Sequence, residues 1–150
     1  MRYSESLVEF VKRWEGFKAV ASPDPLVPGV WDVGHGHVLR AEDRPTWTRE
    51  QADKALREDL DAVAAGVDEA VKVTLAQHEF DALCSLAFNV GNKALETSTL
   101  LRRLNGNDFY GAADEFKRWV RAGGRIVAGL AKRRAAEEAM FSEARYDLSP

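Results

Sequence analysis

The chain has 150 residues, of which 45% are hydrophobic, and a formal net charge of −3 at pH 7. This length is enough for one domain with an ordinary hydrophobic core, and the acidic balance disfavours a nucleic-acid-binding function. Cys84 is the only cysteine, which excludes an intramolecular disulfide, and the apolar run around it predicts a core position. The sequence has no run of about 18 apolar residues and no signal-peptide core, so we expect neither a membrane anchor nor an export signal.

The first predicted helix covers about residues 5–15. One apolar face follows the i, i+3, i+4, i+7 spacing and is formed by Leu7, Phe10, Val11 and Trp14. Ser6 and Glu9 are spaced as a capping box at its start, and Gly16 is expected to end it.

The segment 17–39 is predicted to be non-helical. Several helix breakers interrupt it, namely Pro23, Pro25, Pro28 and Gly29. The stretch "GVWDVGHGHV" then alternates large and small residues, which predicts a short pair of strands. We expect this to be the only β-like region of the chain.

Helices are predicted for most of the remaining sequence. Thr48 and Gln51 form a capping-box pattern before a long helix that we expect to end near Ala65. Thr74 and Gln77 repeat that pattern before the next helix.

Gly91 is expected to stop this next helix, a further helix should open at Asp108, and another should cover about residues 129–145. The prediction is therefore a mainly α, α+β fold in one domain, residues 1–150. A β-containing lobe of about residues 17–45 would face a helical lobe of about 46–150 plus the first helix, with a ligand cleft between them.

Three carboxyl side chains fall close together near the β-like segment. Glu15 ends the first helix, Asp24 lies between two prolines, and Asp32 lies on the predicted strand. Shielding of Glu15 by neighbouring aromatic side chains would favour the protonated form that a general acid requires. Two convergent carboxyls suit glycoside hydrolysis, in which one protonates the leaving oxygen and the other guides water or attacks the sugar. Solvated loop acids are the alternative interpretation.

The histidines of the same segment raise the possibility of a metal site. His35 and His37 are two residues apart, so on a strand they would share a face. A structural zinc site needs four ligands, however, and the other histidine and the cysteine lie far along the chain on a predicted helix. We therefore expect no bound metal.

A basic run without acidic residues lies in the last third of the chain and comprises Lys117, Arg118, Arg121, Arg125, Lys132, Arg133 and Arg134. Such a run suits a polyanionic partner, or it forms a solvated helix face. A nucleic-acid-binding helical module is one candidate, but the run has no helix-turn-helix pattern and no interleaved aromatic residues, so we expect no nucleic-acid partner.

Several stretches resemble, in the same order, the phage lysozymes, which are endolysin-type muramidases. They are "RWEGFKA" with a following loop aspartate, "GVWDVGHGHV", "VTLAQHEFDALCSLAFNVGNKALETSTLLRRLN", "AADEFKRWVRAGG" and "GLAKRRAAEEAMF". The resemblance implies a lysozyme-like fold that binds peptidoglycan in its cleft and needs no cofactor. It also implies hydrolysis of the β-1,4 bond between N-acetylmuramic acid and N-acetylglucosamine, usually with inversion. We expect a monomer made in the host cytoplasm, without stable membrane association, that reaches the wall through a pore made by another protein.

The resemblance also assigns roles to individual residues. Glu15 matches the general acid and Asp24 the family's catalytic aspartate. Arg133 matches an arginine that supports the glutamate, Asn89 a residue that contacts substrate, and Trp119 an aromatic residue of the cleft wall.

Within the strand motif, His37 matches a histidine that pairs with a helix acid. His35 matches a variable position and is expected on the strand at the cleft rim, as a substrate-binding residue.

Asp32 departs from the family pattern, because the family strand normally has a threonine there that helps to hold the attacking water. The loop after Asp24 is also longer, through residues 26–28. Asp32 could orient or deprotonate the water with Asp24 as helper, act as a nucleophile in a retaining or transglycosylase reaction, or only pair with a basic neighbour. We predict inverting hydrolysis in which Asp32 contributes strongly. A wall-binding module without catalytic activity is the remaining alternative.

Overall fold

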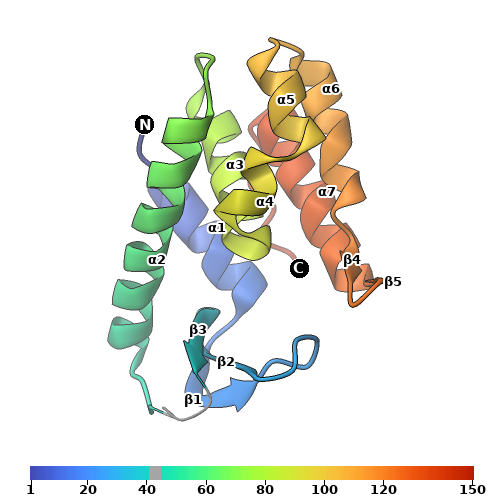
Figure 1. The fold of residues 1–150 in the computed structure, drawn as a ribbon. Coiled ribbons are helices and arrows are strands. Elements are labelled where there is room, and N and C mark those ends of the chain that lie inside the picture. The colour runs from blue at the N-terminus through green and yellow to red at the C-terminus, as the bar shows by residue number, and fades with distance from the viewer. Residues whose placement is uncertain (41–44) are drawn as a thin grey trace.

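A three-stranded antiparallel sheet lies at one end of a bundle of helices in the computed structural model, which describes residues 1–40 and 45–150 (Figure 1). The part of the predicted β-containing lobe at 41–44 lies outside the described residues. A mainly helical α+β fold is confirmed. No helix within the described residues is long and apolar enough to cross a membrane.

Helix α1 (Glu5–Glu15) has the predicted extent and ends at Gly16, where φ is +73°. Its N-cap is Ser4, whose hydroxyl accepts a hydrogen bond from the Leu7 amide at 3.2 Å. The predicted capping box at Ser6 is wrong, because Ser6 lies inside the helix and Ser4 is anchored from elsewhere in the fold.

The sheet consists of β1 (Lys18–Pro23), β2 (Val30–Gly34) and β3 (His37–Arg40) in that order. The predicted strand pair is confirmed as β2 and β3, which are joined by a turn at His35 and Gly36. β1 is added on the other side of β2, so that Ser22 lies opposite Asp32.

A second β element lies within the helical part of the chain. β4 (Arg121–Ala122) and β5 (Arg125–Ile126) form a small hairpin whose turn contains Gly123 and Gly124, both with positive φ. The prediction of a single β-like region was therefore wrong. Strands of two residues are too short to produce a visible alternation of apolar and polar residues.

The capping box of Thr48 and Gln51 at the start of α2 (Arg49–Ala70) is confirmed. The helix continues past the predicted end, because the glycine there serves packing and does not stop the helix. An added Cβ at Gly66 would lie 2.0 Å from Asn92 Nδ2.

Helix α3 (Gln77–Val90) ends at Gly91 as predicted, but its N-cap is Ala76 and not Thr74. The Ala76 amide donates to the carboxylate of Glu79 at 2.8 Å, so an acidic side chain from the first turn satisfies the helix start.

The remaining helices are α4 (Asn92–Glu96), α5 (Thr99–Asn105), α6 (Phe109–Glu115), the short 3-10 helix η1 (Phe116–Arg118) and α7 (Ala128–Glu143). The start of α6 at Asp108 is confirmed, since its carboxylate accepts from the Gly111 amide at 2.8 Å. The first two of these helices were not predicted.

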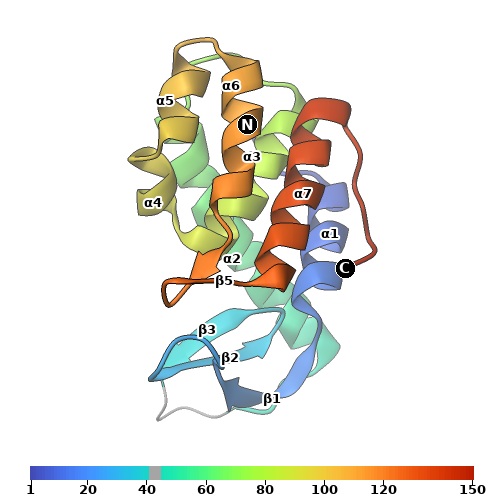
Figure 2. The same cartoon turned by 90° about the vertical axis from the view of Figure 1, so that its right-hand side faces the viewer.

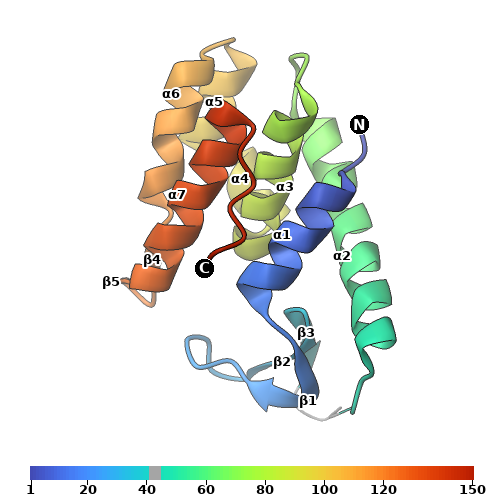
Figure 3. The same cartoon turned by 180° about the vertical axis from the view of Figure 1, so that it is seen from behind.

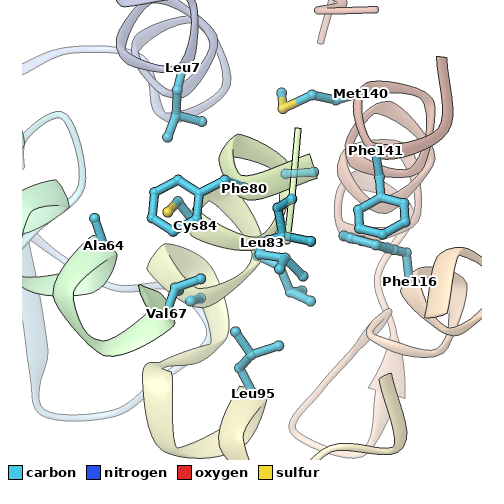
Figure 4. Close-up of a cluster of buried hydrophobic side chains, with 14 of the residues drawn as sticks. Leu7, Ala64, Val67, Phe80, Leu83, Cys84, Leu95, Phe116, Met140 and Phe141 are labelled. Carbon is cyan, nitrogen blue, oxygen red and sulfur yellow. The ribbon is translucent and has the colours of Figure 1, made fainter. Parts of the chain in front are cut away.

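Buried side chains of α3 pack against those of α1, α2, α4 and α7 to form the core (Figure 4). The predicted core position of Cys84 is confirmed, because its side chain is fully buried there among Leu7, Val67 and Phe80. The C-terminal segment crosses the back of the bundle between α7 and α1 (Figure 3). It is fixed to α1 by the Trp14 indole N–H, which donates to the Asp147 carbonyl at 3.0 Å.

Candidate active site

Glu15 lies at the C-terminal end of α1, where the chain leaves the bundle for the sheet (Figure 2). Arg133 of α7 donates from Nη1 to Glu15 Oε1 at 2.5 Å. Only 20% of the Glu15 side chain and 6% of the Arg133 side chain are exposed. The structure thus brings the predicted acid and its predicted supporting arginine into contact. Burial opposes the charged form of Arg133, but the carboxylates of Glu15 and Glu137 hold the pKa of its guanidinium above the usual value.

Glu137 is a residue of this site that the sequence analysis missed. It is fully buried, and its Oε1 accepts from Arg133 Nε at 3.1 Å, Arg134 Nη2 at 2.9 Å and Ser85 Oγ at 2.7 Å. A signal was present, because Glu137 follows the two arginines at the i+4 and i+3 spacing at which helical side chains meet. That spacing does not show that the group is buried.

A cavity of about 380 Å³ is lined by residues of the loop after β1 and of the segment that leads into the β4–β5 hairpin. Figure 2 shows that this loop and this hairpin lie on the same side of the molecule. Its lining includes three of the predicted site residues, Asp24, Asn89 and Trp119. Arg121 and Arg134 also line it. Residues from distant parts of the sequence therefore meet around one cavity of a size suited to a small ligand or a sugar unit.

Asp24 is held by its own loop. Its Oδ1 accepts hydrogen bonds from the amides of Leu26 at 2.7 Å and Val27 at 3.1 Å, while its amide donates to Val30 O at 2.8 Å. These bonds fix the carboxylate at the edge of the cavity despite the longer loop.

Asp32 pairs with a basic neighbour across the sheet. Lys18 Nζ lies 2.6 Å from Asp32 Oδ1, and the Asp32 side chain is 22% exposed. This ion pair is the contact expected if Asp32 only pairs with a basic neighbour.

The two histidines have different surroundings. His35 lies in the turn after β2, is 7% exposed, and has its Nδ1 2.5 Å from the Gly16 carbonyl oxygen. Its predicted place on the strand was therefore wrong, because the two-residue turn takes it out of the strand. His37 pairs with Asp59 of α2 as predicted, with Nδ1 2.8 Å from Oδ2. Within residues 1–40 and 45–150, no cluster of three or more histidine, cysteine or acidic side chains could hold a metal.

The basic run does not form one surface. Arg133 and Arg134 are buried around Glu137, whereas Lys117 Nζ pairs with Asp114 at 2.6 Å and Arg118 Nε with Glu115 at 3.0 Å. The run is divided among η1, the hairpin and α7, so a single solvated helix face is excluded.

Comparison with known proteins gives consistent matches. Residues 12–137 match the family model described as phage lysozyme. An endolysin of Acyrthosiphon pisum secondary endosymbiont phage 1 is 42% identical over 96% of this chain and 100% of its own length. The muramidase domain of SpmX from Asticaccaulis excentricus superposes with a TM-score of 0.85 at 36% identity, covering 94% of this chain and 97% of that one. The endolysin from Escherichia coli O157:H7 phage FAHEc1 gives a TM-score of 0.86 at 30% identity, covering 98% and 97%.

A lysozyme-like fold with an arginine-bound glutamate between its sheet and its helices defines the class of lysozyme-type hydrolases. The predicted fold is thereby confirmed. The chain belongs to the phage lysozyme family.

Proposed function

We propose that this protein is an endolysin that hydrolyses the β-1,4 bond between N-acetylmuramic acid and N-acetylglucosamine in peptidoglycan during host-cell lysis. The observation that carries the proposal is the contact of the shielded Glu15 with the buried Arg133 at 2.5 Å. Family membership and the endolysin and muramidase relatives support the same assignment.

In the proposed reaction Glu15 is the general acid. Its proton moves to the glycosidic oxygen as the bond from that oxygen to the anomeric carbon breaks. A water oxygen bonds to the carbon from the opposite face, and the proton that it loses passes to the carboxylate of Asp32 or Asp24. Asp24, fixed at the cavity edge by Leu26 and Val27, faces the developing positive charge and guides this water.

Asp32 is proposed to help orient or deprotonate the water, which gives inversion. Its carboxylate lies 2.6 Å from Lys18 Nζ, which holds it in place on the sheet. The alternative is that Asp32 attacks the sugar directly, in a retaining or transglycosylase reaction. Carboxyl groups about 5–5.5 Å apart suit that route, whereas about 6.5–9.5 Å leaves room for water.

Substrate contacts are proposed for two other cavity residues, Asn89 and Trp119. Asn89 can donate to and accept from sugar hydroxyl and acetamido groups, and Trp119 offers an apolar ring face. His35 is proposed only to support the turn beside Gly16, and His37 to fasten the sheet to α2.

We further expect a single-domain monomer whose partner is peptidoglycan, without a cofactor, a nucleic-acid partner or stable membrane association. The endolysin relatives support action on the cell wall. Release from the host cytoplasm through a pore made by a separate protein stays a prediction.

Turbidity clearing of permeabilised cells tests the function. Wild-type protein should clear them, and Glu15→Gln should reduce the rate by roughly 100-fold or more, the usual contribution of a positioned acid. Glu9→Gln, an equal charge change on the exposed side of the same helix, should keep the wild-type rate. Wall binding by wild type without clearing would instead identify a non-catalytic wall-binding module. The anomeric form of the first product, followed by NMR, distinguishes inversion from retention.

A further inference from the structure

The proposed acid faces an electrostatic conflict. Arg133 is almost completely buried and its guanidinium lies 2.5 Å from Glu15 Oε1. A cation at this distance favours the ionised carboxylate, whereas a general acid must carry a proton when substrate is bound. Something in the site must therefore limit the effect of the Arg133 charge on Glu15.

Glu137 is placed to limit the effect of the Arg133 charge on Glu15. Arg133 uses two different nitrogens, Nη1 for Glu15 and Nε for Glu137, so one guanidinium serves two carboxylates. Glu137 is completely buried, and the low dielectric of the interior makes its charge act strongly on its neighbours. Its negative charge offsets the positive charge that Glu15 would otherwise face alone.

Two further groups hold Glu137 in place. Ser85 of α3 donates to Oε1 at 2.7 Å, and Arg134 Nη2 reaches the same oxygen at 2.9 Å. Arg134 Nε also lies at ion-pair distance, 2.8 Å, from Oε2. Burial lowers the pKa of Arg134, although Glu137 opposes that shift.

The network joins three helices, and Glu137 offsets one of its two arginine charges whether or not Glu15 carries a proton. Two arginines of α7 face Glu137 on the same helix and Glu15 at the end of α1, while α3 contributes the neutral Ser85. Next to this network, the turn after β2 brings His35 to the Gly16 carbonyl.

We propose that Glu137 is a positioning residue that shares Arg133 with Glu15 and, by offsetting one of the two arginine charges, leaves Glu15 able to carry the catalytic proton. The inference rests on the proposed function of Glu15. It extends that function to a residue that does not touch the substrate and whose effect passes through Arg133.

The pH dependence of kcat/KM on purified peptidoglycan tests the proposal, because its basic limb reports loss of the proton from the general acid. In Glu137→Gln the charge that offsets one of the two arginines is gone, so the basic limb should move to lower pH by about one unit or more. In Arg134→Gln the balance changes in the opposite sense, so the limb should move to higher pH. The double variant Arg134→Gln/Glu137→Gln has the same net charge around Glu15 as the wild type and should return toward the wild-type profile.

Glu138→Gln is the matched control, since it removes the same charge one residue further along α7 from a partly exposed position. Its profile should coincide with that of wild type. A structural role alone would lower the melting temperature and the folded fraction in all network variants without moving the limbs in opposite directions.

The outcomes separate this inference from the proposed function. Inactive wild-type protein would contradict the function itself. If the wild type is active but the basic limbs of the folded variants do not move, or all move in the same direction, the inference about Glu137 is overturned. The proposed function then still stands. Circular dichroism identifies the folded variants. If Glu137→Gln does not fold, Arg134→Gln and the double variant still test the inference. The basic limb should lie at higher pH in Arg134→Gln and near the wild-type position in the double variant.

Discussion

Gly36, in the turn between β2 and β3, lies directly against the carboxylate of Glu15. A Cβ added at Gly36 would lie 2.7 Å from Glu15 Oε2 and 3.0 Å from its Cδ. Gly36 also has a backbone φ of +76°, which residues other than glycine rarely adopt. The turn therefore forms one wall of the position that Glu15 occupies, and Arg133 forms another.

Gly36→Ala should displace Glu15 and reduce kcat by roughly 100-fold, because a shift of about 1 Å in a catalytic group costs that much. Gly29→Ala is the matched control: its φ is +79°, and an added Cβ would meet none of the described atoms within 4 Å. Both variants should lose about 1–2 kcal/mol of stability from backbone strain. Melting curves and kcat for each variant give the comparison. Equal losses of kcat in the two folded variants would count against the contact.

Asp32→Asn should reduce kcat by roughly 100-fold or more if its carboxylate acts on the water. Lys18→Gln removes the partner of Asp32 but leaves that carboxylate, so its effect should stay within a few-fold. Initial rates for the two single variants and the double variant measure this difference. A loss below about tenfold in Asp32→Asn, matched by Lys18→Gln, would reduce Asp32 to a strand residue that pairs with lysine.

Local signals predicted four helix boundaries correctly. Gly16 and Gly91 end their helices, and Thr48 and Asp108 begin theirs, because each signal acts within a few residues of the chain. Ser4 shows the limit of such signals. Its amide donates to Asp81, 77 residues away, so the choice of Ser4 over Ser6 depends on the folded chain.

The site residues show the same difference between what local sequence signals predict and what depends on the folded chain. The resemblance identified Arg133, and the structure brings it to Glu15. Glu137 was missed because the sequence shows an ordinary i, i+4 charge pair, which is usually solvated, and only the packing of α3 against α7 buries it. His35 was misplaced because a one-residue difference in the position of a turn moves a side chain out of the strand.

Cys84 should be unreactive in the folded protein. Burial, together with the nearby Asp81, raises the pKa of its thiol, and the thiolate is the form that reacts. The disulfide reagent DTNB should therefore label it at least about 100-fold more slowly in native buffer than in denaturant. Ser149→Cys in a Cys84→Ala background supplies an exposed control that should react rapidly. Fast labelling of Cys84 in native buffer would contradict its core position.

Tyr146 should make stability depend on alkaline pH. Its hydroxyl donates to the buried Asp81 Oδ2 at 2.6 Å, and burial together with this bond raises the pKa of Tyr146 well above its usual value. Since the pKa is higher in the folded than in the unfolded state, the stabilisation is complete below about pH 10 and is lost as pH rises further. Tyr3, whose pKa burial raises to about 12, adds to the same loss.

Tyr146→Phe should cost about 1.5–3 kcal/mol at pH 7, the contribution of a hydrogen bond to a charged acceptor. The variant should also lose less of its melting temperature than wild type between pH 9 and pH 11, because the unfolded state then has one fewer phenol to ionise. Tyr110→Phe, at a position that is 93% exposed, should match wild type at both pH values. Parallel melting curves of Tyr146→Phe and wild type across this range would show that the bond to Asp81 does not couple stability to pH.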